Sequence, residues 1–401
     1  MADDKEVQEQ TIADEQVLKK YKEAGVLKQL IDSVKPGVSV KAICEKGDRF
    51  LTQETEKKYK DDKEMKKGIA FPTCLSVNNC ICHFSPSKND PDLILKEEDL
   101  VKIDLGAHID GYIAVVAFTL VVGASLEKKV KGRKADVILA AYNAAQATLR
   151  LVKNGKGNYE VTEAVQKIAE SFKCKPIEGM LSHQLKQFKI DGEKTIIQNP
   201  TAAQKKEHEK VEFENYEVYA MDVLVSSGEG SGKELDTKVS IYKKTDVNYL
   251  LKLKASKAFY AEVKKKYQNM PFNLRNFEEE AKAKMGVVEC VSHKLIEPFQ
   301  VLYEKHNEFV AQFKSTLMLL PNGTILATGI PIDLNLYESE YSVKDEELVK
   351  LLAENPNLVS GASSSSSSKN KKKKKKAAGA VGENANKENQ TEKETPADKK
   401  E

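Results

Sequence analysis

Two long apolar stretches dominate the hydrophobic pattern of the chain, and one acidic residue interrupts each of them. Residues 100–120 read LVKIDLGAHIDGYIAVVAFTL and predict a strand, a tight turn at Asp110-Gly111 and a returning strand, with Asp104 among apolar neighbours. Residues 216–230 predict another strand in which Asp222 is embedded. A buried carboxylate is costly unless it meets a metal, a cation or several hydrogen-bond donors. The two aspartates are therefore the first candidates for a functional site.

Further hairpin and helix patterns surround these two strands. Residues 308–328 predict a hairpin that turns at Pro321-Asn322-Gly323. Helical spacing of apolar residues predicts helices at residues 16–35, 37–58, 135–152 and 159–172. The order of a strand with Asp104, a hairpin, two helices and a strand with Asp222 indicates an α+β fold whose two similar halves face each other.

The two ends of the chain differ in composition from its body. Residues 1–15 are acidic and lack an apolar segment, which predicts a disordered N-terminus and no secretory signal. We expect residues 16–341 to form the α+β domain and residues 342–360 an amphipathic helix. Residues 361–401 are Ser/Lys-rich and predicted to be disordered. Eleven lysines against six acidic residues give this tail a charge of +5, whereas the preceding 360 residues carry −2.

Composition excludes several classes of protein. No apolar run approaches the roughly 20 residues that span a bilayer, so membrane insertion is not expected. Six cysteines in 401 residues are too few for a disulfide framework, which favours an intracellular protein. Cys80, Cys82 and His83 invite a zinc interpretation, but the sequence has no second pair of ligands at zinc-site spacing. Buried thiols are the favoured interpretation.

Five motifs resemble, in order, segments of the type 2 methionine aminopeptidase family. They are SVNNCICHFSP at 76–86, KIDLGAHIDGYIAVVAFT at 102–119, IEGMLSHQLKQFKIDGEKTII at 177–197, YAMDVL at 219–224 and AQFKSTLML at 311–319. The resemblance implies a pita-bread fold, in which two pseudo-symmetric α+β halves surround a central site. Relative to that family the chain carries a lysine-rich insert, assigned to residues 243–300.

Active members of that family bind two metal ions through two Asp, one His and two further carboxylates. The resemblance places the first Asp on Asp104, the His on His183 and the third carboxylate on Asp222. The second Asp falls on Val115 and the last carboxylate on Lys314. Two of the five ligand positions therefore hold an aliphatic side chain and a cation.

The altered ligand set predicts a protein that is not an enzyme. Two adjacent divalent ions need several anionic oxygens, which two aspartates and one imidazole do not supply. We expect no cofactor, no bound metal and an ion pair of Lys314 with Asp104 and Asp222. A single metal ion on the two aspartates and His183, or a residual metallo-aminopeptidase, are the alternatives. His83 matches a family histidine near the scissile peptide, but without metal-activated water it is expected to be an ordinary histidine.

Within that superfamily the chain resembles a proliferation-associated, ErbB-receptor-binding group of non-catalytic relatives. The shared features are the altered ligand set, the lysine-rich insert and the polylysine tail. The resemblance implies a protein of the cytoplasm, nucleus and nucleolus that binds structured RNA, rRNA and the ribosome in growth regulation, ribosome biogenesis and translation. Transcriptional co-regulators and an ErbB-type receptor are further implied partners, and an adaptor function is the alternative. We expect a monomer.

Basic and leucine-rich segments are the candidates for these contacts. The lysines expected to contact RNA or the ribosome are Lys243, Lys244, Lys252, Lys254, Lys257, Lys264, Lys265, Lys266, Lys371, Lys372, Lys373, Lys374, Lys375 and Lys376. A solvated helix face is the alternative for the insert lysines. Lys19, Lys20 and Lys22 form a smaller cluster that the resemblance links to nucleolar targeting. Leu348, Leu351 and Leu352 form an LxxLL pattern that predicts partner docking, unless the helix packs on its own domain.

Overall fold

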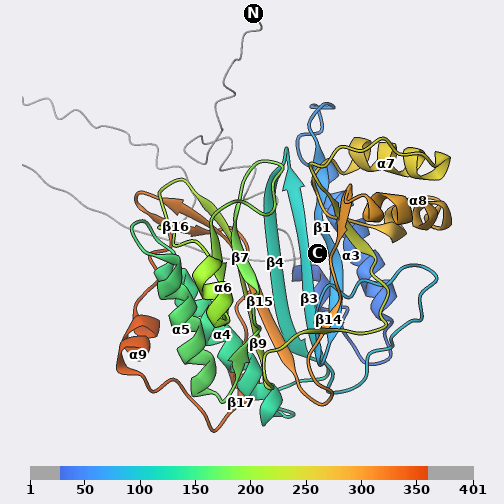
Figure 1. The fold of residues 1–401 in the computed structure, drawn as a ribbon. Helices are drawn as coiled ribbons and strands as arrows, with labels where there is room; N and C mark the ends of the chain where they lie inside the picture. The colour runs from blue at the N-terminus through green and yellow to red at the C-terminus, as the bar shows by residue number, and fades with distance from the viewer. Residues whose placement is uncertain (1–27, 360–401) are drawn as a thin grey trace, which may run out of the picture. The chain divides into compact units, whose positions relative to one another are not determined.

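A nine-stranded sheet forms the centre of the region that the computed structural model describes, residues 28–359 (Figure 1). Its neighbouring strands follow the order β1-β3-β4-β15-β9-β7-β8, with β16 paired to β15 and β6 paired to β9. The bounds are β1 Lys67–Val77, β3 Leu100–Ile109, β4 Tyr112–Val121, β15 Val310–Leu320, β9 Val218–Ser226, β7 Leu181–Leu185, β8 Thr195–Ile197, β16 Gly323–Leu326 and β6 Lys175–Pro176.

The hairpin predicted at residues 100–120 is confirmed as β3 and β4. Asp110 and Gly111 connect the strands with φ values of 55° and 81°, as a tight two-residue hairpin turn requires. All ten residues of β3 are buried, and α3 packs against the face that carries Val101, Ile103 and Leu105. The predicted hairpin at residues 308–328 is likewise confirmed as β15 and β16.

Helices cover the sheet where apolar periodicity predicts them. The helices expected at 37–58, 135–152 and 159–172 are α3 Val40–Glu56, α4 Arg133–Leu151 and α5 Asn158–Ser171. In Figure 1, α3 lies beside β1 and β3, whereas α4 and α5 lie over the other half, where α4 contacts β9 and β15. Five of the six alanines on α4 are fully buried, all except Ala145, so their small side chains allow this helix to approach the sheet closely. Of the helix predicted at 16–35, only α2 Lys28–Ile31 lies within the described residues.

The lysine-rich insert is a small layer with its own apolar core. Its three-stranded sheet has the order β12-β11-β13, with bounds Phe272–Asn273, Ile241–Lys244 and Ile296–Pro298. The helices α7 Lys254–Lys266 and α8 Glu280–Ser292 pack on it with η1 Leu274–Asn276. Aromatic side chains such as Phe259, Phe272 and Phe277 contact one another and fill this core. The insert can therefore hold a defined shape of its own.

Short elements complete the described chain. They are β2 Cys80–Cys82, β5 Val130–Lys131, α6 Ala202–Glu207, β10 Lys233–Glu234, β14 Leu302–Tyr303, η2 Leu334–Leu336, β17 Tyr337–Glu338 and α9 Glu346–Ala353. None of the helices within residues 28–359 combines the length and apolar character needed to cross a membrane. All six cysteines are free and buried, in line with the favoured interpretation of Cys80 and Cys82 as buried thiols.

Candidate functional site

Strand pairing brings Asp104, Asp222 and Lys314 together at the middle of the sheet. Lys314 on β15 lies opposite Asp222 on β9 and opposite Ala117 on β4, and Ala117 in turn lies opposite Asp104 on β3. The Lys314 Nζ lies 2.6 Å from Asp104 Oδ2 and 2.9 Å from Asp222 Oδ2. It also lies 5.4 Å from the centre of the Phe71 ring. Lys314 thus makes the two ion pairs expected from the sequence.

Gln312 is a member of this cluster that the sequence analysis missed. Its Nε2 donates hydrogen bonds to Asp222 Oδ1 at 2.8 Å and to Asp104 Oδ2 at 3.3 Å, and the residue is 2% exposed. Gln312 and Lys314 are two residues apart on one strand, so their side chains point to the same face of the sheet. That spacing was the signal available in the sequence. The Gln312 amide and the Lys314 ammonium together contact both carboxylates, Asp104 through Oδ2 alone.

The electrostatics of the cluster follow from its burial. Burial alone lowers the pKa of Lys314, but Asp104 and Asp222 outweigh burial and raise the pKa above the usual lysine value. Lys314 is therefore an ammonium at neutral pH. Burial raises the pKa of Asp104 to about 6, although Lys314 acts in the opposite direction. Asp104 Oδ1 is buried and has no hydrogen-bond partner among the described residues, which contributes to the cost of ionising this group.

The remaining ligand-matched positions surround the same cluster. His183 on β7 lies opposite Ala220 on β9, and its Nδ1 is buried without a hydrogen-bond partner among the described residues. Burial lowers the pKa of His183, so the ring is neutral at pH 7. The Val115 side chain is 2% exposed and packs in an apolar cluster with Phe71. The position that the resemblance assigns to the second aspartate therefore holds a buried aliphatic side chain.

His83 is held by contacts that do not involve the carboxylates. Its Nδ1 forms a 2.9 Å hydrogen bond with the carbonyl oxygen of Gln300, and its ring contacts Phe71 and Phe299. Burial lowers the pKa of His83 to about 4, so the ring is neutral at pH 7. His83 therefore has a packing role, as expected of an ordinary histidine that takes no part in catalysis.

The structure separates the insert lysines into two groups. Lys243 forms ion pairs with Asp191 and, at 2.8 Å, with Glu297, and its side chain is only 12% exposed. Lys244 is also mostly buried, with its Nζ 3.0 Å from the carbonyl oxygen of Thr245. By contrast, the lysines on the exposed surface of the insert are Lys252, Lys254, Lys257, Lys264, Lys265 and Lys266. The candidate sites at Lys19, Lys20, Lys22 and Lys371–Lys376 lie outside the described residues.

The leucines proposed for partner docking pack on the protein itself. Leu348 is 7% exposed, and Leu351 and Leu352 pack against the same apolar core beneath α4. The helix begins after Asp345, whose carboxylate accepts the N–H groups of Glu347 and Leu348, and not after Ser342 as the sequence suggested. Of the two alternatives for this pattern, the structure therefore supports packing on the domain and not partner docking.

Replacing Leu348 by alanine is expected to lower the free energy of unfolding by about 2–3 kcal/mol, because it leaves a cavity in this core. Val349→Ala on the same helix is the matched control, since Val349 is 46% exposed and its truncation should change stability little. Chemical denaturation measures both. Equal stability of the two variants would show that α9 does not pack on α4 in solution.

Comparison with known proteins agrees with the motifs and the fold. The sequence profile of metallopeptidase family M24 matches residues 22–232. ERBB-3 binding protein 1 of Arabidopsis thaliana is 46% identical over 330 residues, which cover 80% of this chain and 82% of that protein. The curved DNA-binding protein of Schizosaccharomyces pombe is 43% identical over 350 residues, covering 85% of this chain and 91% of the relative.

A solved structure shows the same architecture. The structure of a thermophilic Arx1 matches with a TM-score of 0.77 at 29% sequence identity, covering 85% of this chain and 98% of that one. The predicted α+β pita-bread fold and the resemblance to the ErbB-receptor-binding relatives are thus confirmed. Both relatives described above are named for what they bind and not for a peptidase activity. Because the family profile matches residues 22–232 and the Arabidopsis relative is 46% identical over 80% of the chain, the chain belongs to metallopeptidase family M24.

Proposed function

We propose that this protein is a non-enzymatic RNA- and ribosome-binding protein built on a peptidase scaffold whose metal site has been lost. The observation that carries the proposal is the Lys314 ammonium, which lies within 3 Å of both Asp104 and Asp222. A divalent ion at this place would face a fixed positive charge and only two carboxylates. Among residues 28–359, no group of three or more His, Cys, Asp or Glu side chains is arranged to hold a metal ion.

The proposed loss of catalysis predicts the result of a peptidase assay. Purified protein supplied with Mn²⁺ or Co²⁺ is expected to release no methionine from a Met-Ala-Ser peptide, because no pair of metal ions is available to activate water. A metal-loaded type 2 methionine aminopeptidase is the positive control. Methionine release that disappears in Asp104→Asn protein would overturn the proposal, because it would show catalysis by this site.

The proposed RNA contact is the exposed face of α7. Lys257, Lys264 and Lys265 are exposed there, and the Lys264 ammonium lies 5.2 Å from the centre of the Tyr260 ring. Lysines on a rigid helix can contact phosphates at defined spacing, and a neighbouring tyrosine ring can stack on an unpaired base. The relative named as a curved DNA-binding protein supports a nucleic-acid ligand. In this proposal the lysine-rich tail adds affinity without reading sequence.

Charge reversal on α7 tests the RNA contact. The triple variant Lys257→Glu, Lys264→Glu, Lys265→Glu should bind rRNA fragments at least tenfold more weakly than the unaltered protein. The slope of log affinity against log salt should become about 2–3 units shallower, since each lost phosphate contact removes about 0.9. The matched control reverses three exposed lysines near α6, Lys205, Lys206 and Lys210. If both variants lost the same amount of RNA affinity, net charge and not the α7 surface would explain the binding, and α7 would be removed from the proposal.

Partners and location are part of the same proposal. We infer action in growth regulation, ribosome biogenesis and translation, with the protein in the cytoplasm, nucleus and nucleolus. Binding to an ErbB-type receptor is suggested by the name of the Arabidopsis relative. An adaptor function through Leu348, Leu351 and Leu352 is disfavoured, because those leucines are committed to the core under α4.

A further inference from the structure

A cavity of about 660 Å³ lies at the free edge of β1, beside the insert. This volume falls within the range of small-molecule sites, about 300–1,000 Å³. Five parts of the chain line it: α3, the start of β1, the loop between β2 and β3 at Lys88, His108 on β3, and the segment from the end of α7 to η1. Its lining includes none of Asp104, Asp222, Gln312 and Lys314, so it is distinct from the site described above.

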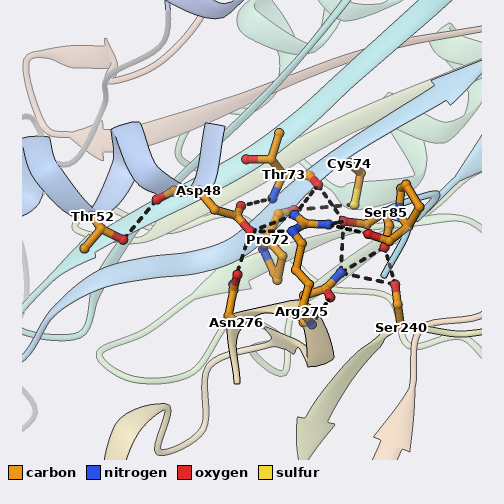
Figure 2. Close-up of polar contacts among 11 residues, drawn as sticks. Asp48, Thr52, Pro72, Thr73, Cys74, Ser85, Ser240, Arg275 and Asn276 are labelled. Carbon is orange, nitrogen blue, oxygen red and sulfur yellow. Dashed lines mark hydrogen bonds and ion pairs between the residues drawn. The ribbon is translucent and has the colours of Figure 1, made fainter. Parts of the chain in front are cut away.

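Positive charge predominates in the lining. The cavity is lined by five cationic side chains and two carboxylates: Arg49, Lys67, Lys88, Lys266 and Arg275 against Glu45 and Asp48. Asp48 does not oppose an incoming anion, because its carboxylate is already satisfied (Figure 2). It accepts hydrogen bonds from the backbone N–H of Thr73 at 2.8 Å and from two guanidinium nitrogens of Arg275 at 2.7 and 3.0 Å. Glu45, the other lining carboxylate, forms no ion pair with any cation among residues 28–359.

Two of the cations are available to a ligand. Arg49 is exposed on α3, and its guanidinium makes no hydrogen bond or ion pair with any residue in the described range 28–359. The Lys88 ammonium has a single 3.4 Å contact, to the carbonyl oxygen of Phe277. Lys67 and Lys266 are partly engaged, Lys67 by two backbone carbonyl oxygens and Lys266 by Glu262. An anion in this cavity could therefore bind Arg49 and Lys88 without displacing an existing ion pair.

A buried histidine adds a neutral donor. His108 on β3 lines the cavity and is 8% exposed. Its Nδ1 accepts the N–H of Gly111 at 3.3 Å, so the proton of the neutral ring lies on Nε2. Nε2 has no hydrogen-bond acceptor within the part of the chain that the structure describes. Burial lowers the pKa of His108 to about 4, which keeps the ring neutral at pH 7.

We propose that this cavity binds an organic phosphate of the size of a nucleoside monophosphate. Arg49 and Lys88 bind the phosphate, as guanidinium and ammonium groups commonly do. His108 donates a neutral hydrogen bond, and Glu45 accepts one from a hydroxyl or amino group on the remainder of the ligand. Tyr267 supplies an aromatic surface in the same lining. The phosphate could belong to a free nucleotide or to the 5′ end of an RNA, and the proposal does not depend on the α7 contact.

Calorimetric titration of the full chain with inorganic phosphate, AMP, and one short RNA bearing either a 5′-phosphate or a 5′-hydroxyl tests this site. AMP or the 5′-phosphorylated RNA should bind saturably, and the 5′-hydroxyl RNA at least tenfold more weakly than its phosphorylated form. Arg49→Gln and Lys88→Gln should each weaken the phosphate-dependent binding about tenfold or more. Lys46→Gln is the matched control, because Lys46 is an exposed lysine on α3 outside the cavity lining.

The probes separate the sources of the phosphate. Arg49-dependent binding of AMP identifies a free nucleotide, whereas Arg49-dependent binding of only the 5′-phosphorylated RNA identifies an RNA end. The proposal is overturned if no probe binds, or if the phosphate-dependent binding is the same in the Arg49→Gln, Lys88→Gln and Lys46→Gln proteins. His108→Phe, which removes the buried donor, provides a second check at a lining residue on β3, with folding verified by circular dichroism. Unchanged affinity in that variant would remove His108 from the site.

Discussion

Replacing Lys314 with methionine should lower the free energy of unfolding by about 3–5 kcal/mol at pH 7.5. The substitution keeps the volume and burial of the side chain but removes the ammonium that lies between Asp104 and Asp222. Two carboxylates, each less than 15% exposed, are then left close together in a poorly hydrated environment. Breaking a buried pair by removing one partner is costly because the other charge stays buried. Urea denaturation of the two proteins measures the difference.

The stability difference between the unaltered and Lys314→Met proteins should become smaller as pH is lowered from 7.5 to 5. Burial already raises the pKa of Asp104 to about 6, above its usual value, so the folded state takes up a proton before the unfolded state does. Without Lys314 the two carboxylates repel each other and this proton uptake becomes stronger, so acid favours the folded variant. Lys128→Met is the control, because Lys128 forms only exposed ion pairs. A deficit that is constant with pH would contradict the assignment of two unpaired carboxylates.

Replacing Arg275 with methionine is the second change with a large expected effect. It should lower the free energy of unfolding of the insert by about 3–5 kcal/mol. Arg275 lies in η1 of the insert and its side chain is 1% exposed. Its guanidinium donates hydrogen bonds to Asp48 on α3, to Ser85 Oγ at 2.6 Å and to the carbonyl oxygen of Thr73 at 3.1 Å (Figure 2). These bonds join the insert to the helix and edge strand of the main sheet, so their loss leaves Asp48 as a buried charge without its cation.

Hydrogen exchange distinguishes a local from a global effect of Arg275→Met. Amides of α7 and α8 should exchange faster by a factor of about 100 or more, as a loss of about 3 kcal/mol implies. The amides of α4 and β9 should change much less. The double variant Asp48→Asn, Arg275→Met should recover part of the loss, since it removes the uncompensated carboxylate as well. No gain in the double variant would contradict the ion pair as the source of the effect.

Local patterns of the sequence predicted most of the elements that position the central cluster. Alternation and turn residues placed β3, β4 and β15 within a few residues of their ends, because each depends on neighbours along the chain. Helical spacing of apolar residues likewise predicted α3, α4 and α5 within a few residues of their ends. The sequence predicted a helix over residues 342–360, whereas α9 is shorter, Glu346–Ala353, with Asp345 as its N-cap.

The sequence by itself determined that Asp104 and Asp222 would be embedded in buried strands, because the apolar pattern around each of them is local. Only the tertiary structure decided which groups meet: Gln312 joins both aspartates, Lys243 turns to Asp191 and Glu297, and the stripe of α9 faces its own core. The physical reason is that side-chain spacing along one element fixes which face a residue occupies. Which residue it meets there is fixed by strand register and helix packing, which bring Lys314 and Asp104 together although they are 210 positions apart.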